Sequence, residues 1–151
     1  MRYRLLALAL VIASMGCKGS VNHDEISAAK SAIEFAEAAF VKHDFDHSYA
    51  LLSDSGKRYV SHETFKETLA RLHPKAFPVS VTASEFEPMP GEKAMHIYLT
   101  GENSGERFYY RLTMEGAAAT GYRVARFYRG TEPYPLSSFR QRLKESPSTR
   151  R

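Results

Sequence analysis

The hydrophobic period changes once along this chain, and that change limits the fold class more than any other feature. Residues 24–43 carry apolar side chains at helical spacing, with Ile26 and Ile33 on one stripe. Pro74 and Pro78 end the helical half. Four segments with alternating apolar and polar residues follow, and sequences such as "GENSG" separate them as turns. Helices followed by antiparallel strands predict an α+β fold, with the N-terminal helices packed on one sheet.

The first sixteen residues have the pattern of an export signal. Arg2 and Arg4 supply positive charge, and residues 5–13 form an uninterrupted apolar run. A run of nine residues is well below the roughly 20 that a helix needs to cross a bilayer. We therefore expect residues 1–16 to be a cleaved signal peptide.

The segment "SMGC" ends this signal on Cys17, the only cysteine of the chain. It resembles the lipobox of bacterial lipoproteins. The resemblance implies that Cys17 becomes the acylated first residue, that residues 17–23 form a lipidated tether, and that the protein is membrane-anchored at the periplasmic face of the cell envelope. Lys18 stands where an inner-membrane retention signal would have Asp, which favours the outer membrane. The alternative is an ordinary signal peptide with an unrelated cysteine nearby.

The order of elements after the tether resembles the nuclear transport factor 2-like superfamily. The matching pieces are "HDFDHSYALLS", "VSHETFKETL" and the last strand "GYRVARF". The resemblance implies a cone over residues 24–136, in which a curved antiparallel sheet wraps around a long first helix. The superfamily contains isomerases, dehydratases and hydrolases as well as non-enzymatic modules, so the fold alone does not select a function.

One face of the predicted sheet is apolar and must face the helices. Its residues are Met95, Ile97, Leu99, Phe108, Tyr110, Leu112 and Met114. We expect this face to line any concave ligand pocket, with Tyr110 as its polar group. Because the face carries neither carboxylate nor histidine, the sequence favours a non-catalytic binding module without a cofactor. A small cone-fold enzyme with a site at the mouth of the cone is the alternative.

The segment "HDFDH" combines two histidines with two aspartates, and zinc takes both ligand types. Asp44 and Asp46, however, are better explained as N-caps of a short helix. We therefore expect no metal site here.

The opposite face of the sheet carries tyrosine, arginine and histidine. Its residues are His96, Tyr98, Arg107, Tyr109 and Arg111. Tyr and Arg are enriched where proteins bind one another, so this outer face is predicted to contact an envelope protein or a second copy of the chain. A solvated convex face is the alternative.

Residues 137–151 are basic, and two prolines precede them. We expect a solvated, disordered tail, with contact to anionic lipid headgroups as the alternative. The formal charge of +4 does not indicate nucleic-acid binding, because an exported protein does not ordinarily meet nucleic acid.

Overall fold

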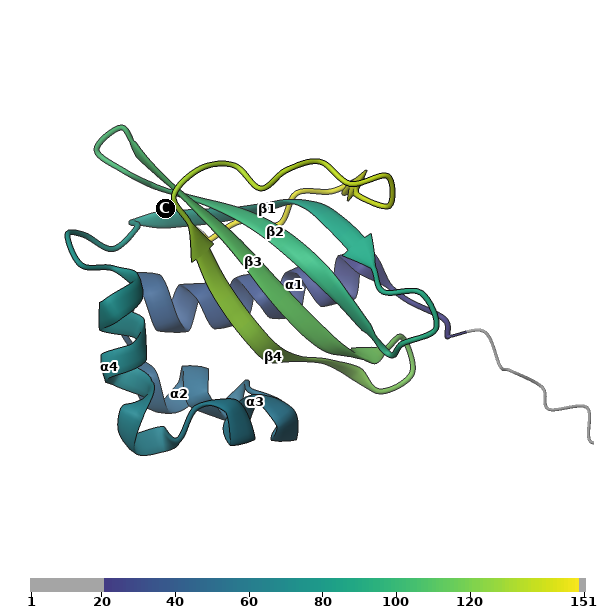
Figure 1. Ribbon diagram of the computed structural model, residues 1–151, viewed down its shortest axis with the longest axis horizontal. Helices are drawn as coiled ribbons and strands as arrows, with labels where there is room; N and C mark the ends of the chain where they lie inside the picture. The colour runs from purple at the N-terminus through teal and green to yellow at the C-terminus, as the bar shows by residue number, and fades with distance from the viewer. Residues whose placement is uncertain (1–20, 150–151) are drawn as a thin grey trace, which may run out of the picture.

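The computed structural model describes residues 21–149 (Figure 1). The predicted signal peptide and Cys17 lie outside these residues. The helical elements are α1 (Glu25–Ala36), the π-helical turn η1 (Glu37–Val41), α2 (Phe45–Ala50), α3 (Asp54–Tyr59) and α4 (His62–Leu72). The strands are β1 (Ser80–Pro88), β2 (Ala94–Asn103), β3 (Glu106–Ala117), β4 (Gly121–Gly130) and β5 (Gln141–Arg142). They form one antiparallel sheet in the order β4-β3-β2-β1-β5, which confirms the predicted α+β fold.

Among the described residues, no helix has the length and apolar character needed to span a membrane.

Short polar side chains start the helices. Asp24 accepts a hydrogen bond from the Ser27 backbone N–H at 3.0 Å, which begins α1. Asp44 caps α2 in the same way, through the N–H of His47 at 3.1 Å. Each cap satisfies an N–H group that the first turn of a helix leaves without a partner. The predicted capping role of Asp44 is therefore confirmed.

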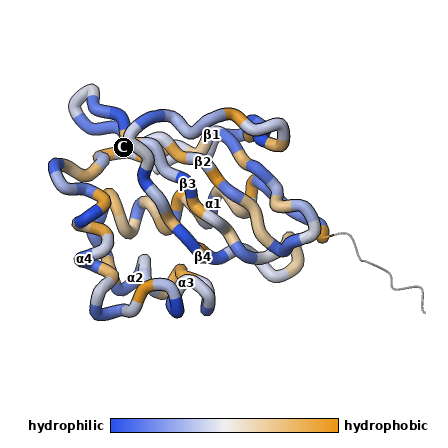
Figure 2. Tube along the Cα trace, in the orientation of Figure 1, coloured by the Kyte–Doolittle hydropathy of each residue, from blue (hydrophilic) through white to orange (hydrophobic). Residues whose placement is uncertain are grey.

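Helix α1 packs across one face of the sheet, which we call the inner face (Figure 1). Its small residues allow the close approach, since Ala28, Ala32 and Ala36 are all fully buried. Phe35 lies 5.5 Å from the ring of Phe127 on β4, centroid to centroid. Hydrophobic and hydrophilic residues alternate along the central strands in Figure 2, as a sheet with one buried face requires.

The C-terminal residues pair with the outer edge of β1. Strand β5 pairs with Glu85 and Phe86 of β1. Further along, the Leu143 N–H donates to the Ser84 carbonyl at 2.9 Å, and the Thr149 N–H donates to the Val81 carbonyl at 2.8 Å. An edge strand presents a row of backbone donors and acceptors that this segment satisfies. The expectation of a disordered tail is therefore wrong for residues 141–149.

The described chain leaves the sheet at two opposite ends. Near the start, the Ala118 N–H of the β3–β4 turn donates to the Asn22 carbonyl at 3.0 Å. Near the finish, Thr149 lies beside the beginning of β1. We call the end with residues 89–93 and 118–120 the tether end, and the end with the β2–β3 turn at residues 104–105 the far end.

Candidate functional site

The apolar residues predicted to line a pocket all belong to the core. Met95, Ile97, Leu112 and Met114 have no exposed surface, and Leu99, Phe108 and Tyr110 expose 1–2%. A side chain that bordered a water-sized space would have accessible surface, so α1 and its neighbours fill this face. A ligand could use it only if the helix moved away.

A buried pair of polar side chains, His73 and Tyr110, lies at the far end of this core. The Tyr110 hydroxyl lies 2.8 Å from His73 Nε2, and His73 Nδ1 lies 2.9 Å from the Leu69 carbonyl. Because the carbonyl can only accept, Nδ1 carries the proton, and the tyrosine hydroxyl donates to Nε2. Phe77 stacks on the imidazole with ring centroids 4.3 Å apart. Both polar side chains therefore use their hydrogen-bonding groups on each other and on the backbone.

The interior holds this pair in its neutral form. Burial lowers the pKa of His73 from 6.5 to about 4. The hydrogen bond to Leu69 opposes this shift, and the neighbouring Arg129 and His43 add to it electrostatically. Burial also raises the pKa of Tyr110 well above its usual range. Sequence patterns do not predict this pairing, because His73 follows the last turn of α4 and lies 37 residues from Tyr110.

The predicted partner surface lies on the outer face, and the chain itself covers part of it. His96, Tyr109 and Arg111 are half-buried and Arg107 is exposed, whereas Tyr98 exposes only 6% of its surface. We call residues 131–149 the C-terminal strap (Figure 1). Tyr134 and Arg140 of the strap lie over this face, and residues 141–149 continue along the edge of β1.

The strap is fastened to the outer face by Arg140. Its guanidinium lies 3.9 Å above the ring centroid of Tyr98 and pairs with the carboxylate of Glu85. It also donates to the Tyr134 carbonyl at 2.7 Å. Burial is the main cause that raises the pKa of Tyr98 to about 12, followed by the hydrogen bond to Glu87. The predicted surface is thus divided into a covered part and an open part.

Aromatic rings lie beside arginines on the open part and at its border with the strap. Arg126 stacks over Tyr59 at 4.2 Å, and Arg111 lies 5.3 Å from the ring centroids of both Tyr128 and Tyr134. We call these five residues the tyrosine–arginine patch. Tyr59 exposes 50% of its surface and Tyr128 exposes 38%, so two large rings meet solvent there.

Tyr59 reaches the patch because α3 lies directly against β4. A Cβ atom on Gly56 would lie 2.5 Å from the carbonyl oxygen of Val124, so glycine is required for this approach. The Ser53 N–H also donates to that carbonyl at 2.8 Å. Sequence periodicity finds the residues of the strands, but it cannot place a tyrosine from a separate helix beside them.

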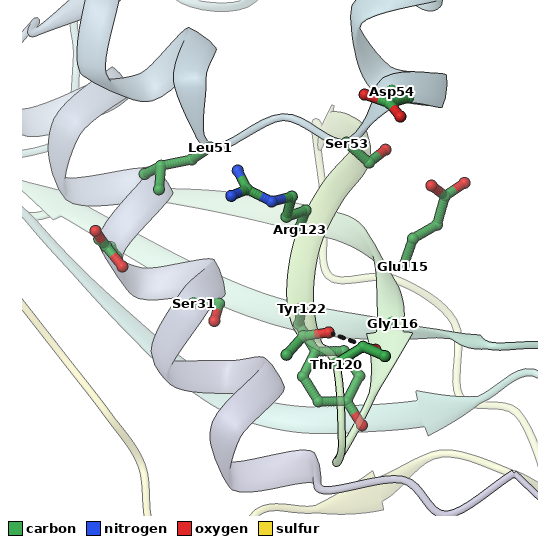
Figure 3. Close-up of a pocket in the computed structure, with 11 residues that line it drawn as sticks. Ser31, Leu51, Ser53, Asp54, Glu115, Gly116, Thr120, Tyr122 and Arg123 are labelled. Atoms are coloured by element: carbon green, nitrogen blue, oxygen red, sulfur yellow. Dashed lines mark hydrogen bonds between the residues drawn. The ribbon is translucent and has the colours of Figure 1, made fainter.

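A polar groove of about 640 Å³ runs between α1, the start of α3 and the β3–β4 hairpin (Figure 3). Its lining residues are Ser31, Glu34, Leu51, Ser53, Asp54, Glu115, Gly116, Thr120, Gly121, Tyr122 and Arg123. Arg123 points toward Leu51 in Figure 3 and donates to the Ala50 carbonyl at 2.8 Å. Glu115 accepts from the Ser55 hydroxyl at 2.5 Å. The groove suits a polar ligand, but two of its charged groups already have partners within the protein.

His43 and Asp46, considered above as zinc ligands, do not form such a site. The Asp46 carboxylate lies 3.0 Å from His62 Nε2, and the ring centroids of His43 and Phe77 are 4.4 Å apart. Within residues 21–149, no group of three or more His, Cys, Asp or Glu side chains has the arrangement to hold a metal ion.

Comparisons with protein-family models, with curated proteins and with solved structures find no match. The fold class alone carries no activity. Any conclusion about function must therefore come from the tyrosine–arginine patch, the polar groove and the His73–Tyr110 pair.

Proposed function

We propose that this chain is a membrane-anchored, non-catalytic binding module of the bacterial cell envelope. The export signal and the lipobox-like "SMGC" support a lipid anchor on Cys17. Each buried methylene of an acyl chain contributes about 0.8 kcal/mol to membrane binding, so two or three chains hold a domain firmly. The resemblance to the nuclear transport factor 2-like superfamily is compatible with this function, since that superfamily includes binding modules.

The observation that carries the binding role is the tyrosine–arginine patch. Tyr59 and Tyr128 are large rings left open to solvent, and Arg126 and Arg111 stack against them. Rings held in place lose little side-chain entropy on binding, and Tyr and Arg dominate the binding energy of many protein interfaces.

The charge of the patch favours an acidic partner protein. Neither Arg111 nor Arg126 forms an ion pair with any side chain in residues 21–149. Lys57 and Arg58, next to Tyr59 in the sequence, are also exposed on α3. A complementary acidic surface would speed association and fix the orientation of the complex.

Photocrosslinking in intact envelopes tests this role. A photoreactive phenylalanine analogue at Tyr128 is expected to crosslink to one envelope protein, and Arg126→Glu in the same chain is expected to suppress the product. The matched control carries the analogue at Val79, an exposed apolar residue at the far end, 61% exposed. Equal crosslinking from both positions, or a product that Arg126→Glu leaves unchanged, would contradict the proposal.

The lipid anchor has its own test. Replacing Cys17 by Ser is expected to move the domain from the membrane fraction to the soluble periplasmic fraction, because the acceptor thiol is lost. Intact-mass measurement of the parent protein should show the added acyl chains. A Cys17→Ser variant that still sediments with membranes would contradict the anchor.

The alternative function is a small cone-fold enzyme, and the His73–Tyr110 pair favours it because imidazole and phenol can exchange protons. A substrate would have to displace Phe77, which stacks on the imidazole. His73→Gln would then abolish turnover while leaving crosslinking from Tyr128 intact. The binding role predicts instead that this variant changes only the stability.

A further inference from the structure

We infer that the tether end of the domain faces the lipid surface and that the far end points away from it. This inference rests on the proposed lipid anchor at Cys17. It goes further by assigning a membrane-facing surface, made of residues 89–93 and 118–120, and by placing the other sites relative to the bilayer.

The first described residues are bound to both turns of the tether end. The Asn22 carbonyl accepts from the Ala118 N–H at 3.0 Å, and His23 Nε2 donates to the Glu92 carbonyl at 3.1 Å. The Asp24 N–H donates to the Tyr122 hydroxyl at 2.8 Å. These three contacts join the chain to the β1–β2 turn, the β3–β4 turn and the start of β4. The position at which the tether enters the domain is therefore fixed.

The tether is short compared with the sheet. Five residue steps separate Cys17 from Asn22, and at full extension they span at most about 18 Å. Strand β3 has 12 residues, which at about 3.4 Å each extend roughly 40 Å from the far end to the tether end. An acylated Cys17 thus keeps the tether end near the headgroups, whatever conformation the intervening residues have.

The turns of the tether end can approach headgroups at little cost. Pro90, Gly91, Ala118 and Ala119 are exposed, and none of them carries a charge. Glu92 and Lys93 are exposed beside them with opposite charges. Small uncharged side chains avoid the desolvation penalty that an ionised group would incur at the interface.

Basic residues at the far end work against this orientation, but their charge is largely balanced. Arg71, Lys75 and Arg107 are exposed at or near the far end, and each basic residue close to an anionic bilayer contributes about 1 kcal/mol. Arg71 pairs with Glu67, however, and Arg107 pairs with Glu102. The tether dominates in this competition, because it raises the effective concentration of lipid at the end to which it is attached. If the tether sets the orientation, the tether end faces the membrane; if the basic residues set it, the far end does.

This orientation places the polar groove beside the membrane. Thr120 of the β3–β4 turn lines the groove (Figure 3), and so does Gly121, the first residue of β4. The tyrosine–arginine patch lies farther along β3 and β4, on the side of the upright domain. A partner standing on the same membrane can reach the patch laterally.

Site-specific fluorescence quenching tests the orientation. The chain has one cysteine, so once Cys17 is acylated an introduced cysteine is the only free thiol. Ala119→Cys labels the tether end, and Ser104→Cys labels the far end with a matched exposed turn position. Each acylated, labelled protein is reconstituted in vesicles of phosphatidylethanolamine and phosphatidylglycerol that contain a headgroup-attached nitroxide quencher.

We expect several-fold stronger quenching at position 119 than at position 104. A variant with about twenty Gly and Ser residues inserted after Ser20 should reduce the difference, because such a linker reaches a further 25 Å or so. Equal quenching would indicate a domain lying flat, and stronger quenching at position 104 would indicate control by charge; either result overturns the inference.

Intact mass and vesicle flotation separate this failure from failure of the proposed function. A protein that is not acylated and does not float would overturn the anchor, and the orientation with it. A protein that is acylated and floats, but shows equal or reversed quenching, overturns the orientation alone.

Discussion

The two faces of the sheet, built from the same strands, differ in what covers them. Phe127 and Tyr128 are neighbours on β4, yet Phe127 exposes 4% of its surface and Tyr128 exposes 38%. Helix α1 and the neighbouring helical segments cover the inner face, whereas the C-terminal strap covers only part of the outer face. The comparison indicates that the inner face provides stability, whereas the open part of the outer face meets solvent and is where we propose that a partner binds.

Each face also has a buried tyrosine whose hydroxyl bonds to another side chain, and the two partners differ in charge. On the inner face Tyr110 bonds to neutral His73. On the outer face Tyr98 donates to the carboxylate of Glu87 at 2.6 Å and lies under the guanidinium of Arg140. The outer face tolerates charged hydrogen-bond partners because solvent is near. The interior requires neutral partners because burying an ion there costs free energy.

The largest expected effect comes from opening the inner face. Phe40→Ala should lower the free energy of unfolding by about 3–5 kcal/mol, since Phe40 is fully buried and stacks on Tyr110 at 4.7 Å. Denaturant unfolding measures the loss. Phe139→Ala is the control, because Phe139 exposes 58% of its surface and should change little. Equal effects of the two variants would contradict the placement of η1 against the inner face.

Acid should act on the inner face through His73. The unfolded chain binds a proton near pH 6.5 and the folded protein only near pH 4, so the unfolded state gains protons first as the pH falls. The free energy of unfolding is therefore expected to decrease between these values, by up to about 3 kcal/mol. His96, whose pKa burial also lowers, adds to the same slope.

The variant His73→Gln shows how much of this pH dependence of the free energy of unfolding comes from His73. Glutamine can still donate to the Leu69 carbonyl and accept from Tyr110, but it does not titrate. Unfolding measured across this pH window should be clearly less pH-dependent in the variant. A slope as steep as that of the parent would show that His73 is not held neutral by the interior.

The strap should have a smaller effect, confined to the outer face. Arg140→Ala is expected to cost about 1–3 kcal/mol, because it leaves the partly buried Glu85 carboxylate without its cation. Arg142→Ala is the matched control, since Arg142 is exposed and only two residues away. If both variants unfold at the same denaturant concentration, Arg140 does not stabilise the attachment of the strap to the outer face.

Strand alternation predicted which residues share the inner face, because burial of Met95, Ile97 and their neighbours forces one register. It could not predict His73, whose partner is set by tertiary packing. It also missed the strap, since residues 141–149 form backbone bonds with β1 that need no side-chain pattern. Tyr59 joins the patch only through the close approach of α3 at Gly56.

The most direct test of the binding role is a paired measurement on β4, using Phe127→Ala and Tyr128→Ala. Phe127→Ala should lose about 3–5 kcal/mol of stability. Tyr128→Ala should stay within about 0.5 kcal/mol of the parent. Both variants carry the photoreactive analogue at Tyr59, and at a temperature where both are folded Tyr128→Ala alone should lose the crosslink to the envelope partner. A Tyr128→Ala variant that keeps the crosslink, or that unfolds as readily as Phe127→Ala, would contradict the division of roles between the two faces.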